Sequence, residues 1–164
     1  MMTPERFLAE VVAPALTALD LDGPAARELL LGTALQESRL RNIPQAGGPA
    51  LGYFQMEPAT HDDIWENFLA YRPDLAARVT ALLPDGAPLP SDLLSYPLYA
   101  AAMARLLYAR VAAPLPAAGD IAAQAAYYKR WYNTPEGAAT VEAYLGNWRS
   151  AMGEGACAPG SPVC

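Results

Sequence analysis

Prolines spread along the whole chain are the feature that most restricts how it can fold. There are 16 of them in 164 residues, and a proline inside a helix removes a hydrogen bond and clashes with the preceding turn. The segments between them are rich in alanine, leucine and arginine, which favour helix. The sequence therefore predicts an all-α fold made of short helices.

The length of the chain suits one domain followed by a tail of different composition. A chain of this length can bury about 70% of its unfolded surface, and 53% of its residues are hydrophobic. We expect residues 1–150 to form one domain and residues 151–164 to form a Gly/Pro-rich C-terminal tail. Cys157 and Cys164 both lie in this tail, where an oxidising environment would be needed to join them. We expect them to take no part in an active site.

Capping residues and prolines mark where helices are expected to start. Thr3 and Pro4 open a helix that continues to Leu19 with a kink at Pro14. Asp22, Gly23 and Pro24 open the next, which ends near Ser38. Further helices are expected from a cap at Thr60, over 73–83, over 91–111 with a break at Pro97, over 120–132 from a cap at Asp120, and over 134–149 from a cap at Thr134-Pro135-Glu136.

Charge and hydropathy exclude several classes of function. The net charge is −6 and the pI is about 4.7, so no basic face is expected for a nucleic-acid backbone. Glu5 and Glu10 among the first apolar residues indicate an amphipathic helix in place of a signal peptide. No apolar run reaches the roughly 18 residues that could span a bilayer. We expect a monomer without membrane insertion, which stays cytoplasmic until it is released or exported.

One acid shares a helix face with apolar side chains. Glu37 lies at three- and four-residue spacings from Ala34 and Thr33, with Leu30 one turn further back. A carboxyl group held against apolar walls resists ionisation, which is how enzymes raise the pKa of a general acid to about 6–7. The alternative is a solvated or paired surface residue, the usual state of a glutamate at a helix end.

The segment after this helix is irregular and rich in turn-forming residues. Residues 39–53 contain Pro44, Gly47, Gly48, Pro49 and Gly52, which break a helix and favour a loop or a small hairpin. This segment leads into Gly52-Tyr53-Phe54-Gln55-Met56-Glu57-Pro58-Ala59-Thr60. A polar, glycine-containing loop placed directly after Glu37 suggests the lining of a substrate groove.

Together, Glu37-Ser38 and the pattern Gly52-x-x-Gln55-x-x-Pro58-x-Thr60 resemble the catalytic domain of the soluble lytic transglycosylases, in the goose-type lysozyme-like superfamily. The resemblance covers about residues 27–148. A weaker second match is Tyr132-Asn133 before a turn that contains Gly137. The resemblance implies a lysozyme-like helical domain that cleaves the glycan strands of peptidoglycan between N-acetylmuramic acid and N-acetylglucosamine.

The resemblance also implies roles for particular residues. Glu37 would be the single general acid and base, and the product would be a 1,6-anhydromuramic sugar, formed without a metal or other cofactor. Gln55 would hydrogen-bond sugar substituents, and Ser38 would support Glu37 or a sugar. Tyr132 would flank the acid, with Tyr127 or Tyr128 as alternatives. Tyr53 would also meet the substrate, although Tyr53-Phe54 and Glu57 depart from the residues that are usual in the family.

Two other readings stay open. A hydrolytic muramidase, such as an endolysin, would need a second carboxylate to activate water or to act as nucleophile. Residues 38–56 contain no Asp or Glu, which favours the transglycosylase, but Glu57, Asp62 and Asp63 remain candidates. The other reading is a non-catalytic peptidoglycan-binding or phage structural protein. For the enzyme as well, membership of a phage particle or of a secretion assembly stays open. A zinc enzyme is not expected, because His61 is the only histidine.

Overall fold

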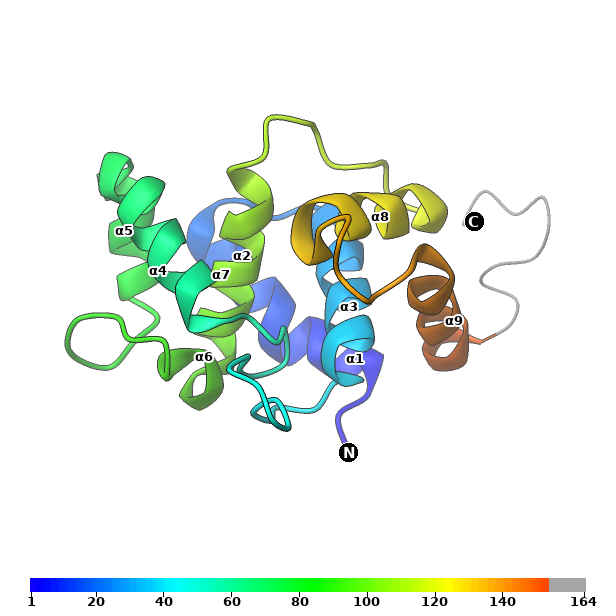
Figure 1. Ribbon diagram of the computed structural model, residues 1–164. Helices are drawn as coiled ribbons and strands as arrows, with labels where there is room; N and C mark the ends of the chain where they lie inside the picture. The colour runs from blue at the N-terminus through cyan, green and yellow to red at the C-terminus, as the bar shows by residue number, and fades with distance from the viewer. Residues whose placement is uncertain (154–164) are drawn as a thin grey trace.

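The computed structural model describes residues 1–153, and helices make up most of this part of the chain (Figure 1). The all-α prediction is confirmed: within these residues no strand forms, and isolated bridges pair Leu51 with Pro44 and with Met56. Cys157 and Cys164 lie outside the described residues. The helical elements are α1 (Pro4–Phe7), the π-helical η1 (Leu8–Val12), α2 (Ala13–Leu19), α3 (Pro24–Ser38), α4 (Pro58–Asn67), the 3-10 turn η2 (Leu69–Tyr71), α5 (Pro73–Thr80), α6 (Asp92–Ser95), α7 (Pro97–Ala109), α8 (Ile121–Tyr128), the π-helical η3 (Lys129–Asn133) and α9 (Val141–Met152).

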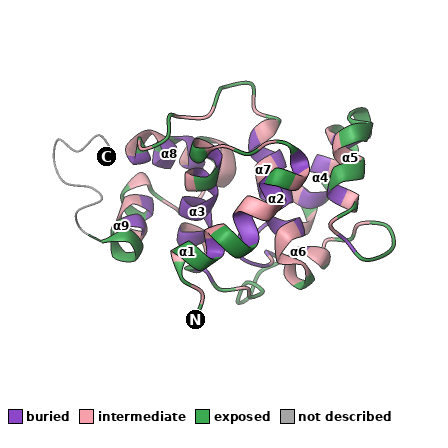
Figure 2. Ribbon diagram, turned by 180° about the vertical axis from the view of Figure 1, so that it is seen from behind, coloured by how far each residue is buried: buried purple, intermediate pink, exposed green. Residues whose placement is uncertain are grey.

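The central element is α3, which lies in the middle of the molecule in Figure 1 and packs against η1, α7, α8 and α9. Residues 29–35 are buried one after another, as the purple ribbon of α3 in Figure 2 shows. A helix whose residues are buried all round belongs in the interior of a domain and not on its surface. These four elements surround α3, so the residue at its last turn has protein on several sides.

The N-terminal helices form one continuous run from Pro4 to Leu19. As predicted, Thr3 caps this run, and its side chain accepts a hydrogen bond of 3.3 Å from the backbone N–H of Arg6. Pro14 does not break the run. Instead, the π-helical turn η1 directly precedes α2; π-helices are rare and occur mostly as single turns inside longer helices.

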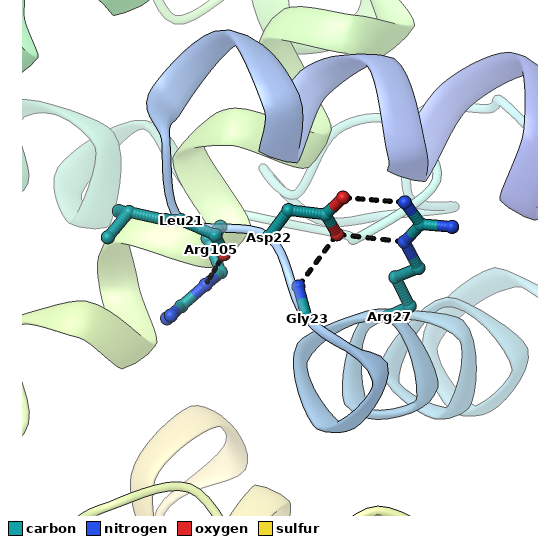
Figure 3. A network of polar contacts seen from close by, with 5 residues as sticks. All are labelled: Leu21, Asp22, Gly23, Arg27 and Arg105. Carbon is teal, nitrogen blue, oxygen red and sulfur yellow. Dashed lines mark hydrogen bonds and ion pairs between the residues drawn. The ribbon is translucent and has the colours of Figure 1, made fainter.

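A polar network fixes the corner between α2 and α3 (Figure 3). Asp22 accepts hydrogen bonds from the backbone of Gly23 at 2.7 Å and from the guanidinium of Arg27 at 2.8 Å. Arg105, on α7, donates to the carbonyl of Leu21 at 3.1 Å. The corner is therefore tied both to the first turn of α3 and to α7, which fixes where α3 begins.

Two predicted helix starts are wrong. Thr60 is not a cap, because α4 already begins at Pro58, a proline at the first helical position, with Glu57 as the N-cap residue. The last helix does not start at Thr134, whose φ of 77° lies in the left-handed region. It starts at Val141, where the Thr140 side chain accepts a hydrogen bond of 3.1 Å from the Ala143 backbone.

Other bounds also differ from the expected ones, since the helix expected to reach Val111 ends at Ala109. The helix that starts at Pro73 ends at Thr80, and α9 continues to Met152. Among the helices of residues 1–153, none combines the length and the hydrophobicity that a membrane span requires.

We expect Gly32→Ala to destabilise the fold. Gly32 lies in buried α3, and a Cβ at this position would overlap the hydroxyl of Tyr144 on α9. Overpacking of a filled interior typically costs about 1–3 kcal/mol. Urea unfolding followed by circular dichroism measures the loss.

Gly146→Ala is the matched control. Gly146 is also helical, but a Cβ there meets nothing within 4 Å. Alanine is favoured over glycine in a helix by up to about 1 kcal/mol, so this variant should be as stable as the wild type or more so. Equal stability of the two variants would contradict the close packing of α3 on α9.

Candidate functional site

A cleft of about 710 Å³ lies between the loop that follows α3 and the segment that follows η3 (cyan and orange in Figure 1). It contains the one group in the described chain whose pKa is raised into the range of a general acid at near-neutral pH. A smaller cavity of about 330 Å³ beside Leu35 and Asn147 holds no carboxylate. The residues that line the cleft are Glu37, Gln45, Ala50, Gln55, Met56, Glu57, Thr60, Leu107, Tyr132, Asn133, Thr134, Gly137 and Ala138.

Glu37 enters the cleft from the last turn of α3. The helix ends directly after it, because Arg39 adopts the left-handed conformation that closes a helix, with a φ of 52°. Burial raises the pKa of the Glu37 carboxyl group from its ordinary value of 4.5 to about 6, while a hydrogen bond from Tyr128 acts in the opposite direction. The predicted partly buried acid is therefore present in the structure.

The hydrogen-bond partner of Glu37 is Tyr128. Its hydroxyl donates to Glu37 Oε1 at 2.5 Å, and its ring is fully buried. Burial and the negative charge of Glu37 both raise the pKa of Tyr128, so the hydroxyl keeps its proton and remains a donor. The sequence motif predicted Tyr132 as the tyrosine beside the acid, with Tyr128 only as an alternative.

A group of packed tyrosines surrounds this hydrogen bond. The Tyr128 ring lies 5.8 Å from that of Tyr132 and 5.2 Å from that of Tyr144, and Tyr108 lies 5.5 Å from Tyr132. Aromatic rings displace water from the carboxyl group of Glu37, which is the physical cause of its raised pKa. Tyr108 and Tyr144 were not foreseen, because they come from α7 and α9 and no local spacing connects them with Glu37.

Gln55 lines the cleft, as the motif predicts, but its side chain also holds the loop. Its Nε2 donates to the carbonyls of Ile43 at 2.8 Å and Gly52 at 2.9 Å. Two carbonyl acceptors fix the orientation of the amide, so Oε1 is the atom with which Gln55 could meet a ligand. The backbone of Gln55 has a φ of 45°, in the left-handed region that non-glycine residues seldom adopt.

Ser38 and Tyr53 do not line the cleft. The buried Ser38 hydroxyl donates to the carbonyl of Tyr53 at 2.7 Å and joins the loop to the end of α3. The Tyr53 ring is buried with its centroid 5.0 Å from that of Phe7. Their predicted contact with a substrate is corrected: one residue anchors the loop and the other packs in the core.

The structure separates the two predicted tyrosines of α8 and η3. Tyr132 lines the cleft, and its hydroxyl donates to the carbonyl of Phe54 at 2.7 Å. Tyr127 does not line the cleft, and its hydroxyl donates to the carbonyl of Ala113 at 2.8 Å. Tyr132 thus stays a candidate contact, whereas Tyr127 is not at the site. Adjacent residues of a helix point about 100° apart, and Tyr128 takes the position next to Glu37.

Of the three candidates for a second carboxylate, the cleft contains Glu57. It is the exposed N-cap residue of α4. Asp62 lies 2.9 Å from Nδ1 of the buried His61, and Asp63 pairs with Arg110. Asp62 and Asp63 therefore interact with other residues and do not line the cleft. Glu57 is the remaining candidate for a second carboxylate.

Several lining residues had no predicted role, among them Gln45, Asn133 and Thr134. Tyr132-Asn133-Thr134 was noted as a motif, but only its tyrosine was assigned to substrate binding. Asn133 accepts a hydrogen bond from Lys129, which also donates to the carbonyl of Gly137. One lysine thus holds the turn that forms this wall.

Within residues 1–153, His, Cys, Asp and Glu form no group of three that could hold a metal ion. Comparison of the chain with models of protein families, with curated proteins and with solved structures gives no match. The interpretation of the cleft therefore depends on its own geometry and on the sequence motif.

Glu37→Gln is expected to change how stability depends on pH. The pKa of Glu37 is about 6 in the folded chain and near 4.5 when unperturbed, so the folded state binds this proton more tightly. The wild type therefore loses stability as the pH rises from about 4.5 to about 6, by at most about 2 kcal/mol because the group is partly solvated.

The glutamine side chain of this variant carries no charge at any of these pH values and avoids the loss. The free energy of unfolding of Glu37→Gln, relative to the wild type, should therefore be higher above pH 6 than below pH 4.5, as chemical denaturation at several pH values would measure. Glu66→Gln, which removes an exposed carboxylate on α4, should show no such difference. A relative stability of Glu37→Gln that falls as the pH rises would contradict the assigned environment.

Proposed function

We propose that this chain cleaves the glycan strands of peptidoglycan as a lytic transglycosylase with a lysozyme-like fold, and that Glu37 is its general acid and base. The observation that carries the proposal is the partly buried Glu37 carboxyl group, with a pKa of about 6, in a cleft that Gln55 also lines. The sequence motif that resembles the transglycosylases supplies the substrate class.

The reaction needs one proton donor and one nucleophile. Protonated Glu37 gives its proton to the glycosidic oxygen, and the bond from that oxygen to the anomeric carbon of the muramic acid breaks. The 6-hydroxyl oxygen of the same sugar then attacks the anomeric carbon, and its proton passes to the Glu37 carboxylate. The acid is restored and a 1,6-anhydro sugar forms, so one carboxylate serves both steps.

Hydrolysis is the second candidate, and the position of Glu57 favours it. This carboxylate lines the same cleft as Glu37, and a pair of carboxylates is what a water-consuming glycosidase uses. Glu57 belongs to the loop end and α4, whereas Glu37 belongs to α3. The product decides between the two reactions, because a transglycosylase leaves anhydro ends and a hydrolase leaves reducing ends.

A non-catalytic wall-binding or virion role would use the same cleft without chemistry. The raised pKa of Glu37 supports catalysis, because binding alone does not require a partly desolvated acid. The proposed site of action is the cell wall, which the chain would reach after release or export, as a free enzyme or within a phage particle or secretion assembly.

We expect Glu37→Gln to lose peptidoglycan cleavage by about 10²–10⁴-fold, the usual contribution of a general acid. Purified peptidoglycan and mass spectrometry of the released fragments measure both the rate and the ends. Wild-type fragments should end in anhydromuramic acid, which is lighter than the reducing form by one water. Glu66→Gln should cleave like the wild type.

Two results would contradict this assignment in different ways. Cleavage by Glu37→Gln at the wild-type rate would remove Glu37 from the reaction. Reducing ends, together with loss of cleavage in Glu57→Gln, would establish the hydrolase. Binding of peptidoglycan by the wild type without any cleavage would favour the non-catalytic role.

Tyr128→Phe should move the pH dependence of cleavage to higher pH. Because Glu37 must begin protonated, the wild-type kcat/KM should fall as the pH rises through about 6. The Tyr128 hydroxyl stabilises the carboxylate and lowers the pKa of Glu37, so its removal raises that pKa and keeps the acid protonated at higher pH.

The control is Tyr127→Phe, which removes a hydroxyl bonded to Ala113. It should leave the pH at which kcat/KM falls unchanged. A shift to lower pH in Tyr128→Phe, or an equal shift in both variants, would show that the hydrogen bond to Glu37 does not determine the pH at which kcat/KM falls.

A further inference from the structure

Apart from Tyr132, the ionisable residues that line the cleft within the described chain are both acids. Glu37 and Glu57 are accompanied by neutral polar groups and by apolar side chains, and the lining contains no lysine, arginine or histidine. The chain as a whole has a net charge of −6. A ligand that enters this cleft therefore meets a negative potential.

Basic side chains of the described chain contact groups other than Glu57. Lys129 donates to Asn133 and to the carbonyl of Gly137. Arg110 pairs with Asp63, and Arg41 donates to the carbonyl of Ser38. The acceptors of Lys129 are neutral, so this ammonium keeps its charge against the wall that Asn133 and Gly137 form and offsets part of the negative charge there. The ion pairs of the described residues do not include Glu57, which leaves its carboxylate without a cation partner.

Glu57 is better placed than Glu37 to meet a ligand cation. Glu37 already accepts a hydrogen bond from Tyr128 and has to be protonated to act as an acid. Glu57 is exposed, and although it occupies the N-cap position of α4, its side chain makes no capping hydrogen bond. Its carboxylate therefore has its oxygens available to an incoming donor.

We propose that the cleft selects glycans that carry a free sugar ammonium, as in de-N-acetylated glucosamine, over glycans in which the same nitrogen is acetylated, and that Glu57 is the residue that recognises the ammonium. This inference deepens the proposed function, on which it rests for the choice of a glycan. An ammonium donates charge-assisted hydrogen bonds to a carboxylate, whereas an acetamido group brings no charge to the cleft.

The test compares the binding of two probes, a glucosamine tetrasaccharide and its fully N-acetylated counterpart, in mildly acidic buffer. An exposed ion pair contributes up to about a five-fold preference, so we expect the wild type to bind the glucosamine probe more tightly by up to this factor. Calorimetry gives the affinities, and amide chemical shifts in residues 42–57 identify the cleft as the binding site.

Glu57→Gln should bring the ratio of the two affinities close to one, and Glu66→Gln should leave it at the wild-type value. Glu66 belongs to the same helix, is exposed and does not line the cleft, so the pair separates local recognition from net charge. Added salt should also reduce the wild-type ratio, because it screens exposed charges.

Equal wild-type affinities, or an unchanged ratio in Glu57→Gln, would overturn this inference. If the chain cleaves peptidoglycan but shows no preference for the ammonium probe, the proposed function stands and only the selectivity is wrong. If it shows the preference but leaves peptidoglycan intact, the selectivity stands and the proposed reaction fails. Failure to bind either probe would overturn the selectivity, and peptidoglycan cleavage would then be judged separately.

Discussion

The hydrogen bond between Tyr128 and Glu37 is the interaction around which the candidate site is arranged. A partly buried carboxyl group is costly unless a donor meets it, and here one hydroxyl does so at 2.5 Å. That contact requires α3 and α8 to lie side by side, with the tyrosines of α7, η3 and α9 packed around it. The pKa of Glu37 is therefore a property of several helices, and any change in their packing would alter it.

The loop between α3 and α4 depends on polar contacts with its own backbone. Ser38 holds the Tyr53 carbonyl, Gln55 holds two carbonyls, and Tyr132 reaches across from η3 to hold the carbonyl of Phe54. Gly52 is needed because its φ is 77° and a side chain there would meet the Leu93 carbonyl. Several residues that the motif assigns to substrate binding therefore maintain the shape of the cleft. Gln55 does this with Nε2 alone, which leaves Oε1 for a ligand.

Sequence reasoning succeeded where local rules act. Pro24 starts α3, Asp120 caps α8 with a hydrogen bond from the Ala123 backbone, and the periodicity around Glu37 placed it against apolar side chains. It failed where the position of a side chain depends on packing between distant parts of the chain. Tyr53 fits an open loop as well as a core position, and only packing against Phe7 distinguishes them. Tyr127 and Tyr128 are neighbours in sequence, so the choice of partner for Glu37 depended on the rotation of α8, which no motif encodes.

A bound cation would have different effects at the two acids of the cleft. A cation close to Glu37 would favour its carboxylate and lower the fraction that carries the proton needed for the proposed reaction. Glu57 lies on a different element, at the start of α4, so the proposed arrangement assigns the ammonium to a residue other than the acid at the end of α3. In the proposed arrangement, recognition of the ammonium and donation of the proton are thus assigned to two residues on two elements of one acidic cleft.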